Sequence, residues 1–442
     1  PNITNKILFV IPTIYHRKII DNKTRHSVYG EYIQQSIIDH INTNNDIVGF
    51  DVDYTFNGDF NVLKSRLDSK IDWVPMELIQ SNNSKNKYDD FINQYSKIIS
   101  NKDFQNLFQF NNISLWHTLS SVFKMLTYTP YIPSYVNFLH SIDDYFKKNK
   151  PKFIFLSYET GPYALAIIIA AQKNQIKTIG VAHATIDKFN PMYSYDQIRD
   201  TTNPLGFPIP DTTLVHGEFS KNTLLNQGYP SNKIIVYGNP IFFNLNQLKN
   251  SLENKNLFKK YDIKKNQKVI LYGTEFLQEY YSAQGKFNYN SLIWKNLLEN
   301  FGNNHDYVLI LKPHPNENTS VYEKILQKSS VTNAKIINDD LFELIHISSL
   351  VISVFSNIMT DALCFEKPVI RVTFDDIEHT VPYEKFNVVL SSNLDNLKLN
   401  IHKIIDDKNL LNMLQKNLFE FLQDQNNITE QEPNSIIDKI IE

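Results

Sequence analysis

A short motif, Lys312-Pro313-His314-Pro315, contains the residue types best suited to binding an anionic group. It follows directly on the apolar run Val308 to Leu311. Each proline removes a backbone donor and favours extended geometry at the residue before it, so Lys312 and His314 are expected at the end of a strand. Strand ends of an open α/β sheet line the ligand crevice. We therefore predict a phosphate contact here, with simple strand termination as the alternative.

Two other strand ends extend this pattern. The run Leu350 to Ser353 predicts a strand, and Ser356-Asn357 then begins a helix-like segment whose first N–H groups and positive dipole end favour phosphate. The run Val269 to Tyr272 ends in Gly273-Thr274, where the glycine allows a ligand or the facing domain to approach the backbone. A serine cap is common in helices that bind nothing. The three strand ends together predict one wall of a binding crevice.

The first half of the chain offers a candidate base, Glu159. It follows the apolar run Phe153 to Leu156 and precedes an apolar helix-like segment, 164–172. A carboxylate at such a strand end is expected to point into a cleft, where it can deprotonate an acceptor hydroxyl. Favourable electrostatics at a helix start is the structural alternative. His183, after the run Thr178 to Val181, is expected to contact acceptor or donor, or else to be a core histidine bonded to the backbone.

A basic loop follows the first apolar run, Ile7 to Ile11. It includes Arg17 and Arg25, and its expected place is the ligand-binding edge of a doubly wound sheet. We expect these arginines to suit a negatively charged ligand. A solvated basic loop is the alternative.

The elements that must position these residues are short β-branched runs alternating with helix-like segments, which indicates α/β architecture with parallel sheets. The runs fall into two series. We expect two Rossmann-like doubly wound domains facing a cleft, at 1–238 and 239–442. The hinge is predicted at Gly238-Asn239-Pro240, with Asn239 also near the donor. An aromatic-rich helical insertion, 104–140, is expected to pack mainly in the core, with contact to acceptor or membrane as the alternative.

Composition excludes several functions. The formal net charge of -3 provides no field for nucleic-acid binding. The single cysteine, Cys364, rules out an intrachain disulfide or a Cys-based zinc site and favours an intracellular compartment. No run approaches the roughly 18 to 20 apolar residues of a membrane-spanning helix. We therefore expect a cytoplasmic protein, with peripheral contact at the inner face of the membrane as the alternative.

Other chemistries lack their motifs. The sequence shows no Walker lysine loop and no Gly-x-Ser-x-Gly elbow. The pair Asp51 and Asp53 has the spacing of a metal-binding DxD motif, but the surrounding residues predict a strand with alternating exposed acids. We therefore expect no catalytic metal and no cofactor.

The order LYGT, KPHP, SVFSNIMTDALCFEKPVI resembles the C-terminal domain of GT-B glycosyltransferases. More narrowly, it resembles bacterial capsule polysialyltransferases, Kdo transferases and CDP-glycerol glycerophosphotransferases, over roughly residues 150 to 375. The resemblance implies that His314-Pro315 and Ser356 hold the phosphate and cytidine side of the donor. Asn357 stands where a second serine is often found. Glu159 resembles the acidic base of these enzymes, and His183 resembles the histidine of a Gln-His-Gly strand end.

The resemblance implies a metal-independent inverting glycosyltransferase that moves a sugar, from a CMP-activated acidic donor, onto a surface glycan or glycolipid. It also implies that 1–238 is the acceptor-binding domain and 239–442 the nucleotide-sugar-binding domain, with the nucleotide-sugar as substrate. Three alternatives stay open: CDP-glycerol-type glycerophosphotransfer, a UDP-sugar transferase or epimerase, and a catalytically silent glycan-binding module. The joint presence of Glu159, His314 and Ser356 argues against the silent module.

Overall fold

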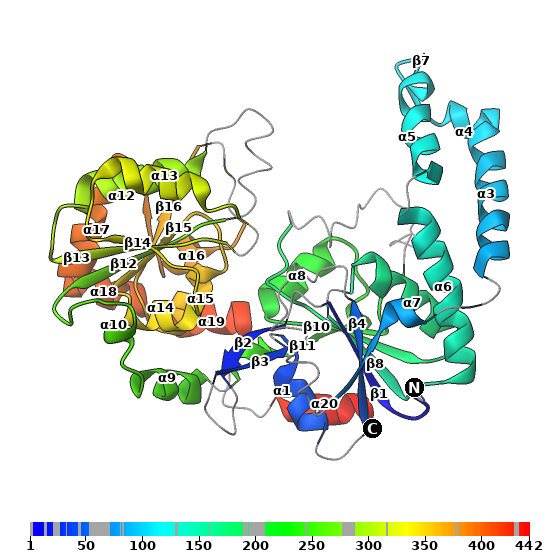
Figure 1. Cartoon of the computed structure of the whole chain (residues 1–442), viewed down its shortest axis with the longest axis horizontal. Coiled ribbons are helices and arrows are strands. Elements are labelled where there is room, and N and C mark those ends of the chain that lie inside the picture. Colours follow the sequence, from blue (N-terminus) through cyan, green and yellow to red (C-terminus); the bar gives the residue numbers. More distant parts are fainter. Residues whose placement is uncertain are drawn as a thin grey trace.

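Two parallel sheets organise the chain (Figure 1). The computed structural model describes residues 3–12, 16–20, 27–31, 33–42, 46–52, 71–79, 81, 84–128, 131–157, 159–188, 193, 208–243, 245–275, 288–314, 317–375, 377, 380–427 and 433–442.

The first sheet has seven strands within the described residues, and all its pairings are parallel. Their order, β11-β10-β9-β8-β1-β4-β5, reverses direction between β1 and β8. Helices cover both faces, which is why the strands are continuous apolar runs. The strands are β1 (Ile7–Pro12), β4 (Ile47–Val52), β5 (Asp72–Pro75), β8 (Phe153–Ser157), β9 (Lys177–Val181), β10 (Thr212–Val215) and β11 (Ile234–Val236).

Several helices accompany this first sheet. They are α1 (Gln35–Ile41), α7 (Pro162–Lys173) and α8 (Glu218–Asn226). A separate antiparallel pair, β2 (His16–Ile20) and β3 (Ser27–Glu31), comes between β1 and α1 in the chain. The basic loop of the sequence is therefore partly a β-ribbon.

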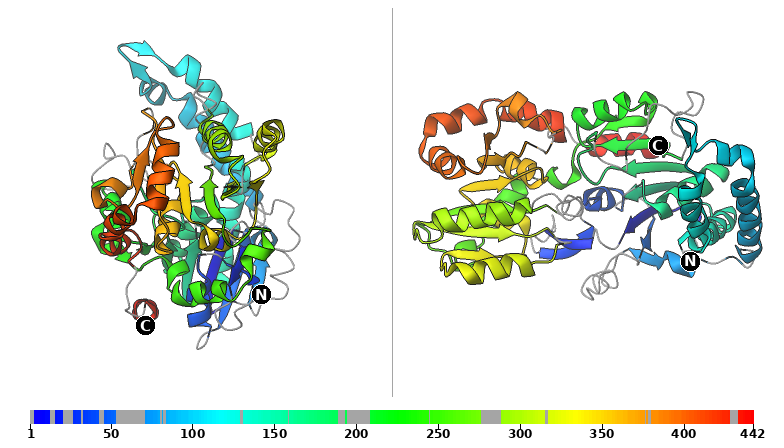
Figure 2. Two further views of the ribbon diagram at one scale, coloured as in Figure 1. Left: turned by 90° about the vertical axis from the view of Figure 1, so that its left-hand side faces the viewer. Right: turned by 90° about the horizontal axis from the view of Figure 1, so that it is seen from above.

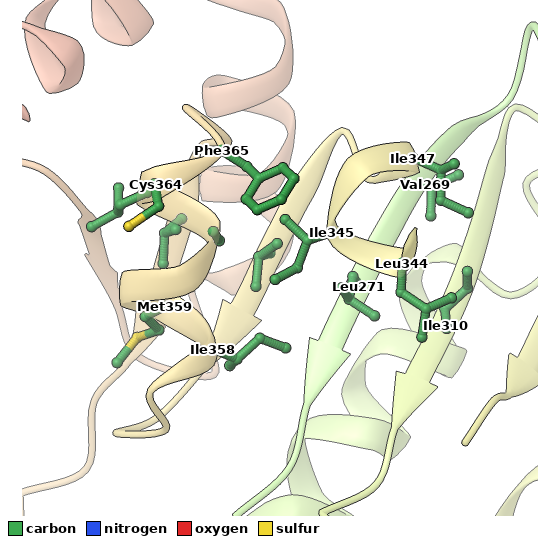
Figure 3. Packing of buried hydrophobic residues seen from close by; sticks show 14 of the residues in the cluster. Val269, Leu271, Ile310, Leu344, Ile345, Ile347, Ile358, Met359, Cys364 and Phe365 are labelled. Atoms are coloured by element: carbon green, nitrogen blue, oxygen red, sulfur yellow. The ribbon is translucent and has the colours of Figure 1, made fainter. Parts of the chain in front are cut away.

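The second sheet has six described strands in the order β14-β13-β12-β15-β16-β17, with its reversal between β12 and β15. Two apolar clusters cover its opposite faces. Figure 3 shows Ile358 and Leu344 beside the strands that carry Leu271 and Ile310. The strands are β12 (Lys268–Gly273), β13 (Tyr307–Lys312), β14 (Ala334–Ile336), β15 (Leu350–Ser353), β16 (Val369–Val372) and β17 (Leu390–Ser392), and the helices include α12 (Tyr289–Phe301), α13 (Ser320–Ser329), α14 (Leu341–Ile347), α15 (Ile358–Cys364) and α17 (Leu397–Asp406). Two Rossmann-like domains, the GT-B arrangement expected from the sequence, are confirmed.

The chain crosses between the sheets after β11, through the one-turn helix η5 (Pro240–Phe242) and α9 (Leu245–Glu253). Gly238 has a φ of +102°, a conformation that favours glycine. The chain later returns along α19 (Leu418–Asn426), which contacts α8, and the Asn239 amide donates to the carbonyl of Asn426 at 3.1 Å. This joint ties the two domains together.

The final helix, α20 (Asn434–Ile441), lies on the first sheet and not on the second. Ile437 and Ile441 pack in the same cluster as Ile37 of α1, and His40 contacts Asp438 at 2.7 Å. The predicted second domain, 239–442, therefore differs from the structure at its end. An amphipathic stripe predicts a helix, but it does not specify which of two sheets the helix covers.

The insertion projects from the first domain as an arm (Figures 1 and 2). At its base Phe138 and Phe146 enter the core of the first domain. Farther out, the aromatic side chains of residues 104–123 contact one another, so core packing holds for the base alone. No helix in the described part of the chain has the length and apolar composition needed to cross a membrane. The arm consists of α3 (Ser84–Ser100), α4 (Lys102–Asn106), β6 (Gln109–Phe110), β7 (Ile113–Ser114), α5 (Trp116–Tyr128) and α6 (Tyr131–Lys148).

Candidate active site

The carboxyl ends of β13, β12 and β15 lie next to one another in the second sheet, as predicted. The backbone N–H of His314 donates to Thr274 Oγ1 at 3.0 Å and to Glu317 Oε2 at 3.1 Å. Thr274 is 3% exposed, its hydroxyl donates to Glu317, and its own N–H donates to the Lys312 carbonyl at 3.1 Å. Thr274 and Glu317 therefore fix the backbone of His314, whose ring is only half-buried. Pro315 lies outside the described residues.

Glu275 is the residue of this crevice that sequence reasoning missed. Its Oε1 accepts three hydrogen bonds: from Ser353 Oγ at 2.6 Å, from the Val354 N–H at 2.8 Å and from the Phe355 N–H at 3.3 Å. The residue is 5% exposed, and burial raises its pKa to about 7 against the opposing effect of these donors. Glu275 joins β12 to β15 where the strand order reverses, which is where ligands bind in open sheets.

Ser356 and Asn357 lie immediately before α15, as predicted. Ser356 Oγ accepts from the Ile358 N–H at 3.4 Å, while Asn357 is exposed and its side chain makes no capping hydrogen bond. Two amides of the preceding turn are already bound by Glu275. The hydrogen-bond donors that this turn offers to a ligand are therefore mainly the side chains of Ser356 and Asn357, because Glu275 already binds the amides of Val354 and Phe355.

Gly273 serves packing in this structure. A Cβ atom at this position would lie 2.7 Å from Ile358 Cδ1 and 2.9 Å from its Cγ2. The missing side chain at Gly273 thus allows helix α15 to pack against β12. The space that we expected a ligand or the facing domain to use is filled by Ile358.

Lys312 is turned toward the far edge of the sheet. Its Nζ donates to Asn338 Oδ1 at 3.0 Å and to the Pro313 carbonyl at 3.1 Å. Asn338 follows β14, on the side of β13 away from β12. A direct phosphate contact by Lys312 would need its ammonium group to leave Asn338.

Glu159 lies at the carboxyl end of β8, beside the strand-order reversal of the first sheet. It is 3% exposed, so its carboxyl group is enclosed and does not point into an open cleft as expected. Tyr193 donates its hydroxyl to Oε1 at 2.9 Å, and Oε2 is buried without a hydrogen-bond partner among the described residues. Burial raises the pKa of Glu159 to about 7, opposed by its own amide and by Tyr193.

A polar cluster near Glu159 was also missed. Glu31 Oε2 accepts from the Ile33 N–H at 2.9 Å and from the Gln34 N–H, and the Gln34 amide donates to Ser157 Oγ. All three side chains are buried, and the cluster joins the end of β3 to the end of β8. Glu31 and Gln34 lie more than a hundred residues before Ser157 in the sequence, so no local sequence pattern indicates this cluster.

The other residues predicted to contact a ligand, His183, Asn239, Arg17 and Arg25, lie in different parts of the chain. His183 is half-buried, whereas the nearby His216 is the buried histidine bonded to backbone: its Nε2 lies 2.9 Å from the Ala182 carbonyl, and burial lowers its pKa to about 4. Asn239 Oδ1 accepts from the Ile241 N–H at 3.2 Å, a capping contact at the crossing between domains. Arg17 lies on β2. Arg25 is outside the described residues.

The expectation that Asp51 and Asp53 are exposed acids is wrong for Asp51. Asp51 is buried in β4, and Asp53 is outside the described residues. Within the described ranges, no group of three His, Cys, Asp or Glu side chains is placed to hold a metal ion.

Residues 176–381 match the model of the CDP-Glycerol:Poly(glycerophosphate) glycerophosphotransferase family. The uncharacterized protein MJ1060 of Methanocaldococcus jannaschii is 25% identical over 242 residues, which is 50% of this chain and only 40% of that relative's length. The chain therefore spans well under two thirds of this curated relative.

Solved structures with the same fold cover nearly the whole chain. The UDP-GlcNAc 2-epimerase from Neisseria meningitidis bound to UDP-GlcNAc aligns with a TM-score of 0.55 at 16% identity, covering 99% of both chains. The UDP-GlcNAc 2-epimerase of Methanocaldococcus jannaschii, in complex with UDP-GlcNAc and UDP, aligns with a TM-score of 0.54 at 16% identity, again covering 99% of both chains. The spinosyn rhamnosyltransferase SpnG aligns with a TM-score of 0.50 at 9% identity, covering 99% of this chain and 100% of that one.

At these identities the structural likeness establishes the two-domain fold, and the family match concerns residues 176–381, which include His314 and Ser356. The narrower resemblance to polysialyltransferases and Kdo transferases stays a prediction. The chain thus has the GT-B fold, and its residues 176–381 resemble the CDP-glycerol glycerophosphotransferases.

Proposed function

We propose that this enzyme transfers a sugar with inversion, and without a metal, from a CMP-activated acidic-sugar donor to a hydroxyl group of a surface glycan or glycolipid. The observation that carries the proposal is the carboxyl group of Glu159. It is buried at a strand end, one oxygen is held by Tyr193, and the other lacks a hydrogen-bond partner among the described residues.

Glu159 is the proposed general base. A base works best when its pKa lies near the working pH, and burial raises the pKa of Glu159 to about 7. The acceptor hydroxyl donates its proton to Oε2, and its oxygen forms the new bond to the anomeric carbon. The bond from that carbon to the phosphate oxygen breaks, so CMP leaves with the electron pair. Tyr193, bound to Oε1, orients the carboxyl group.

The leaving phosphate is assigned to the crevice at the ends of β12, β13 and β15. His314 supplies an imidazole hydrogen-bond donor from a backbone held by Thr274 and Glu317, while Ser356 and Asn357 supply further hydrogen-bond donors. Donors aimed at developing charge in a preorganised site are typically worth about 3 to 4 kcal/mol each. We assign Lys312 a secondary role because Asn338 holds its ammonium group.

Contacts to the donor sugar are assigned by chemistry. Arg17 and Arg25 would suit the carboxylate of an acidic sugar, and His183 would contact the acceptor or donor beside Glu159. No nucleic acid is expected as a partner, because the chain carries a net charge of -3.

Glycerophosphate transfer from CDP-glycerol is the second candidate, and the family match favours it. In that reaction the deprotonated hydroxyl attacks phosphorus, and CMP again leaves into the second domain. The same base and phosphate crevice serve both reactions, so only the identity of the donor distinguishes them.

Calorimetric titration with CMP, CDP and UDP, followed by turnover assays with a CMP-activated acidic sugar and with CDP-glycerol, tests the proposal. We expect CMP to bind tightest and the acidic sugar to be consumed. Consumption of CDP-glycerol alone would establish the second candidate. UDP preference would indicate a UDP-sugar enzyme, since two solved structures of this fold contain UDP-GlcNAc.

The crevice assignment has its own variants. His314→Ala should weaken CMP binding at least tenfold, whereas the matched control His305→Ala replaces an exposed histidine at the opposite end of β13 and should not. Equal CMP affinity in both variants would contradict the crevice assignment.

A further inference from the structure

Exposed apolar side chains are concentrated at the outer part of the arm. We define the arm tip as residues 97–126, from the end of α3 through α4, β6 and β7 into α5. Of thirteen exposed large hydrophobic residues in the described part of the chain, eight lie in this segment. They are Ile98, Leu107, Phe110, Ile113, Leu115, Val122, Met125 and Leu126.

A tight hairpin presents two of these side chains at the end of the arm. Phe110 and Ile113 are paired across β6 and β7, and they are 67% and 65% exposed. Asn111 and Asn112 between them have φ values of 50° and 62°, the left-handed conformation of a two-residue hairpin turn. Figure 1 shows β7 at the far end of the arm, away from both sheets. The turn therefore holds two apolar side chains outward, far from the cores of the two domains.

The arm tip is a built structure with a core of its own. Phe104, Phe108, Trp116 and Phe123 contact one another with ring centroids 5.2 to 5.8 Å apart. The Leu115 N–H donates to the Phe108 carbonyl at 2.8 Å and closes the segment over these rings. Because the rings fill the interior of the tip, the aliphatic side chains around them stay outside.

The charge of the arm tip is opposite in sign to that of the chain. The tip contains three lysines, Lys97, Lys102 and Lys124, against one acid, Asp103, while the whole chain carries a net charge of -3. All three lysines are exposed. The other polar residues of the tip are mostly Asn, Gln, Ser and Thr. Apolar side chains with aromatic residues and flanking lysines are the composition of segments that lie in the surface of an anionic bilayer.

We propose that the arm tip docks on an anionic lipid surface. Phe110 and Ile113 enter the headgroup region first, with Leu107 and Met125 beside them, and the lysines contact lipid phosphates. The occupant is a bilayer and not the arm tip of a second copy, because two tips in contact would bring together two segments that each carry three lysines against one acid, and like charges repel. This inference does not depend on the proposed reaction, since no residue of the arm tip belongs to the active site.

Vesicle flotation with purified protein tests the proposal. We expect binding to vesicles of phosphatidylcholine mixed with phosphatidylglycerol, and at least tenfold weaker binding to phosphatidylcholine alone. The double variant Phe110→Ser/Ile113→Ser should lose at least tenfold in partitioning. The matched control Leu399→Ser/Phe419→Ser, which replaces two equally exposed apolar residues of the second domain, should bind as the wild type does. Lys102→Gln and Lys124→Gln should each weaken binding about fivefold at low salt.

A site-specific probe gives a second measurement. The only cysteine, Cys364, is buried, so an environment-sensitive dye can be attached at Phe110→Cys or, as a control, at Phe419→Cys. We expect a blue shift with anionic vesicles at position 110 alone. Absence of vesicle binding, or an unchanged double variant, would overturn the proposal. So would a dimer in sedimentation velocity that Phe110→Ser/Ile113→Ser dissociates, because a second copy would then cover the tip.

Discussion

The burial of Glu159 predicts that Glu159→Gln stabilises the protein at alkaline pH. The pKa of this carboxyl is raised from 4.5 to about 7 in the folded state, chiefly by burial. The folded protein therefore holds the proton more tightly than the unfolded chain does. The stability that this group contributes is fully present below about pH 4.5 and is lost as the pH rises through 7.

The size of the effect follows from the two pKa values. A difference of about 2.5 at about 1.4 kcal/mol per pKa unit gives about 3 kcal/mol as the upper limit of the ionisation cost. Glutamine cannot ionise and has nearly the same shape. We therefore expect Glu159→Gln to raise the free energy of unfolding relative to wild type by up to about 3 kcal/mol at pH 8.5, and to give no such gain at pH 4.5.

Urea unfolding of both proteins at the two pH values measures this difference. Glu218→Gln is the matched control, because Glu218 is exposed at the first turn of α8 and pairs with Lys221. The control should show the same offset from wild type at both pH values. A Glu159→Gln offset that does not change between pH 4.5 and pH 8.5 would refute the burial of an ionisable carboxyl at this site.

Three further predictions concern the contacts around the two strand-end sites. Tyr193→Phe removes the hydroxyl donor to Glu159, so the pKa of Glu159 should rise further and the acid limb of the pH–rate profile should move to higher pH. Glu275→Gln should tighten CMP binding above pH 7, because it removes a carboxylate from the crevice. Glu275→Ala should weaken CMP binding, because it releases the turn after β15. Unchanged CMP titrations for both variants would disprove that Glu275 shapes the crevice. Gly273→Ala should destabilise the fold by about 1 to 3 kcal/mol, and Ile358→Ala in the same chain should relieve the clash, as thermal melting would report.

The strands of both domains could be predicted from the sequence because a parallel sheet covered on both faces requires continuous apolar runs. Val308 to Leu311 and Leu350 to Ser353 are such runs, and their ends brought His314 and Ser356 to neighbouring positions as expected. In each sheet the strand order also reverses once, as is usual in doubly wound folds, and the binding crevice is expected at that reversal. Local sequence sufficed here because strand length and polarity are local properties.

Long-range contacts explain what the sequence did not show. Glu275 is a charged residue one position beyond Thr274, but its function as the acceptor of two amides depends on a turn about 80 residues later. Gly273 looked like an opening for a ligand, although Ile358 fills the space. Glu159 was expected in an open cleft and is covered, because Tyr193 comes from a different segment. In each of these cases the contacting residue comes from a distant part of the sequence, and the spacing of apolar residues does not reveal such a contact.

The arm illustrates a related limit. Aromatic residues at helical spacing usually indicate a core, and Phe138 follows that rule. Phe104 and Trp116 instead form a core belonging to the arm tip, which lies outside the domain. The same pattern of residues thus marked two different environments.

The measurement that tests the central assignment most directly compares the turnover of Glu159→Gln with its affinity for CMP. The base assignment predicts that release of CMP from the donor falls by about 10²- to 10⁴-fold, while the dissociation constant for CMP stays at its wild-type value because we assign the nucleotide to the other domain. Wild-type turnover in Glu159→Gln would contradict the account, and so would a loss of CMP binding equal to that of His314→Ala.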